Sequence, residues 1–318
     1  MPPSVLECAL RILNTSDPWE KSDLTDACLK ELRAGLQCYP AGEDCELDAP
    51  PDKPARSDVC VSVSAGKAPK RGRGGTIESR RAILHSLVHI ENWAIDLSHD
   101  ITARFAQPRR MPRQFVEDWF VVAADEARHF RMLEVRLRDL GSSYGAFSAH
   151  DGLWESAQRT SDSLEARLVI EHMVHEARGL DIIPQTIDRF RKNGDGETAD
   201  LLEGVIYPEE VTHVACGLKW LAYLWVRDHS KKEASRVERA CEDIADWAAF
   251  SAEAEAQEEG GILEIVERHF GQEAVGGVVE LFHALVRSNF CGKLKPPFNH
   301  AARAKAGMTR DWYEPLAT

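Results

Sequence analysis

Four long helical patterns in the chain each place a glutamate inside an apolar stripe. The patterns cover residues 77–105, 112–140, 162–193 and 196–229. The glutamates are Glu91, Glu126, Glu176 and Glu210. Because a bare buried carboxylate costs several kcal/mol, four such groups in one helical interior require a compensating positive charge. The pattern therefore favours an all-α bundle whose interior holds cations.

Two of these glutamates begin a Glu-x-x-His pair, which places both side chains on one face of a helix. The pairs are Glu126/His129 and Glu210/His213. A lone glutamate precedes each pair, by 35 residues from Glu91 and by 34 from Glu176. The spacing predicts a repeated helical hairpin and a four-helix bundle with approximate two-fold symmetry. Two further acid-x-x-His matches, Asp96/His99 and Glu280/His283, are treated as chance.

The predicted metal ligands are therefore four glutamates and two histidines: Glu91, Glu126, His129, Glu176, Glu210 and His213. Two divalent ions would supply about four positive charges to this interior. Glutamate and imidazole suit iron best in this setting, with manganese as the other choice. The alternative is a buried salt-bridge network in which Arg128 and Arg178 neutralise the carboxylates.

Supporting groups are predicted around the ligands. Asp96 and Asp181 each follow a lone glutamate by five residues, and a carboxylate there can accept the free N–H of a ligating histidine. Arg128 and Arg178 belong to the same outer set. Four more histidines near the first and third glutamates can add a ligand, pass protons or serve as ordinary helix residues: His85, His89, His172 and His175.

The rest of the chain divides into extensions on either side of the bundle. We expect residues 1–75 to hold two short helices and an irregular Pro- and Gly-rich connector, with the bundle at 76–230. Residues 231–318 are predicted to form helices near 233–257, 261–269 and 272–290, followed by an extended tail from Cys291. The stretch 141–161 is predicted to be a loop.

Composition narrows the class of protein. The net charge of -13 disfavours broad nucleic-acid binding, and no stretch is long and apolar enough for a membrane span. Eight cysteines without a Cys-x-x-Cys pair are typical of a reduced, cytoplasmic protein. A basic run within 67–81, with Arg303, Lys305 and Arg310 near the C-terminus, leaves contact with RNA open but disfavoured.

Several segments resemble a ferritin-like family catalogued as a domain of unknown function. They include HIENWAIDL (89–97), ADEARHFRML (124–133), HEARGLDI (175–182) and EEVTHVACGLKW (209–220). DPWEKSDLT (17–25), YGAFSAHDGLWE (144–155) and PPFNHAARAKAG (296–307) are similar to it as well. The resemblance implies the ferritin-like fold and the same six ligands. In arrangement, the bundle is also distantly similar to a ferritin-like tRNA hydroxylase.

The predicted activity is that of a di-iron or Fe/Mn oxidoreductase, an oxygen-activating hydroxylase or monooxygenase of an organic substrate. Its partners would be dioxygen or peroxide, an unidentified electron donor and an unidentified substrate, for which a modified RNA nucleoside is one candidate. A peroxidase or ferroxidase is the first alternative. A non-catalytic helical adaptor with a vestigial metal site is the second. A homodimer is a further expectation.

Overall fold

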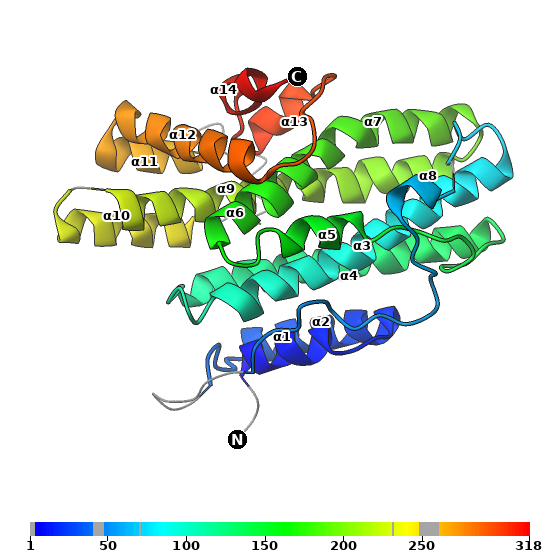
Figure 1. Cartoon of the computed structure of the whole chain (residues 1–318), viewed down its shortest axis with the longest axis horizontal. Helices are drawn as coiled ribbons and strands as arrows, with labels where there is room; N and C mark the ends of the chain where they lie inside the picture. Colours follow the sequence, from blue (N-terminus) through cyan, green and yellow to red (C-terminus); the bar gives the residue numbers. More distant parts are fainter. Residues whose placement is uncertain (1–3, 41–47, 70, 231, 248–260) are drawn as a thin grey trace. The chain divides into compact units, whose positions relative to one another are not determined.

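The computed structural model describes residues 4–40, 48–69, 71–230, 232–247 and 261–318, and these residues form an all-α helical bundle fold (Figure 1). Within them the only β pairing consists of two isolated bridges, Ser62 with Ala149 and Leu294 with Ala317. The predicted all-α class is confirmed. The chain divides into two compact units, which are described separately.

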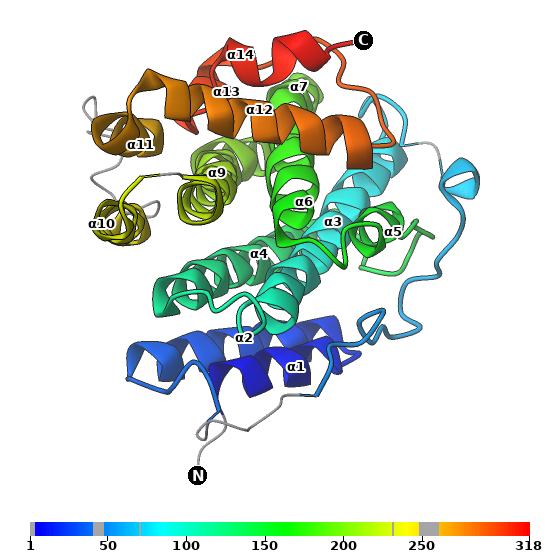
Figure 2. The same cartoon turned by 60° about the vertical axis from the view of Figure 1, so that its left-hand side comes forward.

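The first unit contains residues 1–158 and 186–203. Its helices are α1 (Val5–Leu13), α2 (Pro18–Arg33), the 3-10 turn η1 (Ala65–Lys67), α3 (Ile77–Phe105), α4 (Arg113–Asp139), α5 (Gly152–Gln158) and α8 (Gly196–Leu201). α3 and α4 form a long hairpin, and α1 and α2 pack on it (Figure 2). The N-terminal helices therefore cover one side of the hairpin that carries the first Glu-x-x-His pair.

Local sequence signals set the ends of the α3–α4 hairpin. The Thr76 side chain accepts a hydrogen bond from the Ser79 N–H and caps α3, while Pro112 precedes the first residue of α4. Gly141 ends α4 with a φ of 76°, a left-handed conformation that glycine adopts without steric cost. Both helices run without interruption between these ends.

The second unit contains residues 159–185 and 204–318. Its helices are α6 (Leu164–Val169), the π segment η2 (Ile170–His175), α9 (Tyr207–His229), α10 (Ala234–Asp246), α11 (Ile262–Phe270), α12 (Gln272–Asn289), α13 (His300–Lys305), α14 (Arg310–Tyr313) and the 3-10 turn η5 (Glu314–Leu316). α7 (Glu176–Lys192) and the π segment η3 (Leu202–Ile206) each have residues in both units. Within the second unit, α9 packs against both α6 and η2.

Gly217 explains how α9 can approach the π segment so closely. A Cβ atom at this position would lie 2.6 Å from the His172 carbonyl oxygen and 2.9 Å from the Met173 Cγ atom. Since real Cβ atoms do not come this near to backbone oxygen, only glycine fits here. One residue in α9 thus fixes the distance between two helical segments.

The helices predicted from the sequence lie where the structure has helices, but the π segments η2 and η3 interrupt the third and fourth of them. Residues 248–257 of the predicted helix 233–257 lie outside the described residues. The predicted loop at 141–161 was wrong in part, because it contains α5, whose Trp154 and Ala157 are buried against Trp93 and Leu97. This tertiary contact stabilises a helix too short to show a clear period.

The extended tail predicted from Cys291 was also wrong in part, because it contains α13, α14 and η5. Asn299 caps α13 by accepting a hydrogen bond from the Ala302 N–H. The sequence did not predict these short helices, because the Pro296-Pro297 pair indicates an extended chain. In addition, no helix of the described ranges has both the length and the apolar character needed to cross a bilayer.

Candidate metal centre

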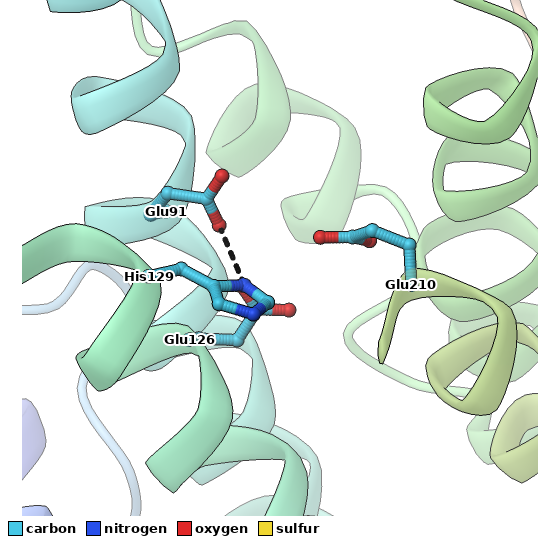
Figure 3. A group of neighbouring side chains, drawn as sticks. All are labelled: Glu91, Glu126, His129 and Glu210. Atoms are coloured by element: carbon cyan, nitrogen blue, oxygen red, sulfur yellow. Dashed lines mark ion pairs between the residues drawn. The ribbon is translucent and has the colours of Figure 1, made fainter. Parts of the chain in front are cut away.

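The first helical hairpin brings two glutamates and a histidine together in its interior. Glu91 extends from α3, while Glu126 and His129 extend from α4 one turn apart (Figure 3). The His129 Nδ1 atom lies 3.6 Å from a Glu91 carboxylate oxygen and 3.5 Å from a Glu126 carboxylate oxygen. All three residues are buried, with 5% or less of their surface exposed. The i,i+3 spacing on α4 and the packing of α4 against α3 therefore bring these three side chains together.

Burial makes this arrangement electrostatically costly without a cation. Desolvation raises the pKa of the Glu91 carboxyl well above its ordinary value of 4.5, and the nearby Glu126 charge raises it further. His129 opposes both effects, since its hydrogen bond and charge lower the pKa of Glu91. The two carboxylates would be stabilised together in their charged form by a divalent cation placed between them.

The second Glu-x-x-His pair has the same local geometry. At the start of α9, the His213 Nδ1 atom lies 3.8 Å from a Glu210 carboxylate oxygen, and both side chains are buried. Glu176, the first residue of α7, is half-buried. Both pairs therefore present a carboxylate and an imidazole on one helix face.

A buried group of four side chains could hold a metal ion. Glu91, Glu126, His129 and Glu210 each offer one ligand atom, and these atoms lie within 4.8 Å of one another (Figure 3). Three carboxylates and one imidazole form a hard oxygen- and nitrogen-donor set of the kind that iron, manganese and zinc accept. Four of the six predicted ligands thus belong to one group, whereas Glu176 and His213 are not members of it.

Sequence reasoning missed a buried acid close to the third predicted glutamate. Glu171 lies in the π segment η2, its side chain has no exposed surface, and the His175 Nε2 atom is 3.9 Å from its carboxylate. It precedes Glu176 by five residues, which regular α-helical geometry places about 140° away around the axis. A π segment changes this register, and π segments often occur at functional sites. Neighbouring His172 is buried as well.

Asp96, predicted to support a ligating histidine, has two cationic partners in the structure. The fully buried Lys21 Nζ of α2 lies 2.5 Å from one Asp96 oxygen, and an Arg56 nitrogen lies 2.9 Å from the other. The Arg56 guanidinium also stacks over the Trp93 ring, 3.3 Å from its centroid. These contacts attach the N-terminal segment to α3, five residues past Glu91.

Asp181 has a parallel arrangement in the second unit. The buried Arg303 guanidinium of α13 donates to both Asp181 oxygens, at 2.9 and 2.7 Å, and the Asn299 N–H donates to one of them. The half-buried Arg178 reaches the same carboxylate at 3.5 Å and donates to the Lys295 carbonyl. The two aspartates of the sequence repeat thus each attach a terminal extension to a hairpin helix.

The remaining predicted groups have identified partners. Arg128 is partly exposed and pairs with Asp125 at 2.7 Å. The His89 Nδ1 atom is 2.9 Å from the Tyr144 hydroxyl, and His85 accepts a hydrogen bond from the Gly145 N–H. Burial lowers the pKa of both histidines to about 4. They are therefore neutral near pH 7 and hold the 144–150 segment against α3.

Members of the basic run also have local partners. Arg80 donates to the Gly74 carbonyl, and Arg81 donates to the Leu140 carbonyl at the end of α4. Arg71 donates to the Ser86 hydroxyl, while Lys70 lies outside the described residues. Arg81 thus links α3 to the end of α4, whereas Arg71 and Arg80 link the connector to α3. Contact with RNA stays a disfavoured alternative.

Comparison with known proteins places the chain in a family. An uncharacterised protein of Haemophilus influenzae is 34% identical over 219 residues, which is 65% of this chain and 73% of that protein. No solved structure matches the chain. The model of the family described as "Protein of unknown function (DUF455)" matches residues 14–270. The chain therefore belongs to the DUF455 family of proteins of unknown function.

Proposed function

We propose that the chain is a ferritin-like oxidoreductase whose bundle holds two metal ions, iron or an Fe/Mn pair, and that it hydroxylates an organic substrate. The observation that carries this proposal is the buried group of Glu91, Glu126, His129 and Glu210. An apolar helical interior does not gather three carboxylates without a counter-charge. A purely structural bundle has no need of such a group.

The proposed ligand roles follow the sequence repeat. Glu91, Glu126 and His129 hold one ion from the first hairpin. Glu176, Glu210 and His213 hold the second. Glu210 also contributes to the first ion, since its carboxylate belongs to the same group as the first three ligands. This set is the one that carboxylate-bridged di-metal bundles use.

A pair of redox-active metal ions would supply the electrons needed to activate dioxygen or peroxide. The protein's own residues have simpler tasks. Glu91 and Glu126 hold charge in a site from which burial excludes water. The Glu91 carboxyl, whose pKa is raised, can also retain a proton whenever its oxygen is not bound to a cation. The His129 Nδ1 atom lies within 3.6 Å of both carboxylates, so a charge on the imidazole would offset part of their repulsion.

Elemental analysis of the purified chain tests the metal content directly. We expect about two ions per chain after expression with iron and manganese available, and loss of both in the Glu126→Ala/Glu210→Ala double variant. Glu117→Ala is the matched control, because Glu117 lies on α4 but pairs at the surface with Arg113. A parent chain that binds neither metal would refute the proposal.

Oxygen consumption by the reduced, metal-loaded chain tests the redox class. We expect uptake that depends on the metals and disappears in the double variant, with the Glu117→Ala chain unaffected. Loaded metal with no reaction toward dioxygen or peroxide would instead support an adaptor with a vestigial centre. Iron oxidation without oxidation of any organic compound would support a ferroxidase.

A further inference from the structure

Asn299, the N-cap residue of α13, forms hydrogen bonds with three helices of the second unit. Its side-chain amide donates to the Leu180 carbonyl of α7 at 3.1 Å and to the Tyr207 hydroxyl of α9 at 2.6 Å. Its side-chain oxygen accepts from the Ala302 N–H of α13 at 3.2 Å. Since a carbonyl only accepts and an N–H only donates, these partners fix which end of the amide is which. Both amide hydrogens therefore link α13 to other helices.

The Leu180 carbonyl needs a donor from outside its own helix because of Pro184. In a regular α-helix this carbonyl would accept from the N–H of the residue four positions later. That residue is Pro184, which lies inside α7 and has no N–H. The Asn299 amide supplies a donor in its place. The proline thus creates an acceptor on α7 that a side chain of the C-terminal segment uses.

The short helix that begins at Asn299 is held firmly against α7. Arg303, four residues along, is 1% exposed and donates to both Asp181 oxygens. The Asn299 N–H donates to the same carboxylate at 2.8 Å. α13 also packs against α9. Because a buried, bidentate ion pair is costly to break, Asn299 is a fixed link rather than a side chain that samples many positions.

The two helices that Asn299 links carry predicted metal ligands close to the points of attachment. Leu180 follows Glu176 by four residues, and Tyr207 precedes Glu210 by three. At 1.5 Å per residue, these separations correspond to about 6 Å and about 4.5 Å along the helix axes. A shift of α9 relative to α7 would therefore change the separation of the two glutamates.

We propose that Asn299 is a positioning residue for the second metal ion, a role that rests on the proposed di-metal function. Its amide sets the separation of α7 and α9, so that Glu176 on one helix and Glu210 and His213 on the other reach the same ion. Asn299 acts through the two helices and is not itself a ligand. Metal affinity depends strongly on groups that hold the ligands in place, so loss of this link should weaken the second ion selectively.

Asn299→Ser tests the link while keeping α13 capped. Serine is a good N-cap residue, but its hydroxyl is too short to replace both amide donors. Isothermal titration calorimetry should show the second ion bound about tenfold more weakly and the first ion unchanged. Tyr207→Phe, which removes only the acceptor on α9, should shift the second ion in the same direction. Asn289→Ser is the matched control, since the Asn289 amide donates to the Leu285 carbonyl of its own helix.

Pro184→Ala separates positioning from the simple need of a carbonyl for a donor. In Asn299→Ser the Leu180 carbonyl loses its donor, and the urea midpoint should fall. In Asn299→Ser/Pro184→Ala the new N–H at position 184 can serve this carbonyl, so the midpoint should recover. The second ion should still bind weakly, because the link to Tyr207 is not restored. If its affinity recovered together with the midpoint, Asn299 would have a structural role alone.

Hydrogen exchange of the metal-free chain tests the link without any ion. Asn299→Ser should speed amide exchange across residues 207–213 at least about threefold, because the start of α9 loses its attachment. Unchanged exchange there would overturn the inference. A parent chain that binds no metal would refute the proposed function. Two ions bound with equal affinity by the parent and by Asn299→Ser would refute the positioning role alone.

Discussion

The two helical hairpins of the sequence repeat are built differently. In the first hairpin, α3 and α4 are regular α-helices of 29 and 27 residues. In the second, each arm contains a π segment, η2 at Ile170–His175 and η3 at Leu202–Ile206. η2 directly precedes Glu176, and η3 ends four residues before Glu210. The repeat in the sequence therefore does not guarantee equal geometry at the predicted ligands.

The difference shows how a repeated motif can acquire unequal halves. In the first hairpin, regular helix geometry is enough to bring Glu91, Glu126 and His129 together. In the second, the π segments shift the register and bury an additional acid, Glu171. π segments lose regular hydrogen bonding and persist where the surrounding structure supports them, here through the contact of Gly217 with η2.

The largest expected loss of stability concerns Asp96 and Asp181, the aspartates at equivalent positions of the two hairpins. Asp96→Ala leaves the buried Lys21 without its closest carboxylate, and Asp181→Ala leaves the buried Arg303 in the same situation. Each substitution should lower the free energy of unfolding by about 3–5 kcal/mol in urea denaturation. Asp188→Ala, at an exposed pair with Lys192, should leave the midpoint unchanged. Unequal losses for the two aspartates would show that the extensions are not equivalent.

Metal affinity distinguishes the ligands of the two hairpins. Glu126→Gln should weaken binding of the first ion by about a hundredfold, because Glu126 belongs to the buried four-residue group. Glu176→Gln should remove the second ion and spare the first. Glu171→Gln is the comparison variant. Isothermal titration calorimetry measures how many ions each variant binds. If Glu171→Gln lost the second ion and Glu176→Gln kept it, Glu171 would replace Glu176 as the proposed ligand.

Gly217→Ala tests the packing that accompanies the π segment. Although alanine normally favours a helix over glycine, the new Cβ would meet the His172 carbonyl at 2.6 Å. We expect a loss of about 2 kcal/mol in the free energy of unfolding. Gly276→Ala in α12, where a Cβ meets nothing within 4 Å, should be neutral or stabilising. If both variants behaved alike, the close approach of α9 to η2 would not matter for stability.

The smallest expected effect is the loss of stability that the buried Glu91 carboxylate causes in the metal-free chain. Since burial raises the pKa of Glu91, the metal-free chain should lose stability as pH rises from about 4.5 through the folded-state pKa. Glu91→Gln should weaken this pH dependence and stabilise the metal-free chain near pH 7 by about 1 kcal/mol. Thermal melts at several pH values measure it. A destabilised Glu91→Gln chain would show that the carboxylate is compensated without a cation.

Periodicity alone predicted the main helices because long apolar stripes with capping residues leave little choice of structure. The bounds of α3 and α4 agree with the predicted ranges to within a residue. Short elements escaped prediction, since α5 and α13 are stabilised by contacts of Trp154 and Arg303 with distant residues. The π segments were not predicted either, because the spacing of apolar residues over one turn is too short to distinguish a π-helix from an α-helix.

The sequence by itself determined that four acids lie on apolar helix faces, and that two of them are followed by a histidine one turn later. Tertiary structure decided which of these side chains meet: Glu91, Glu126, His129 and Glu210 form one group, while Glu176 lies half-buried behind a π segment. It also decided that Asp96 and Asp181 bind the terminal extensions. Helical periodicity fixes the face on which a residue lies, whereas partners far along the chain are set only when the helices pack.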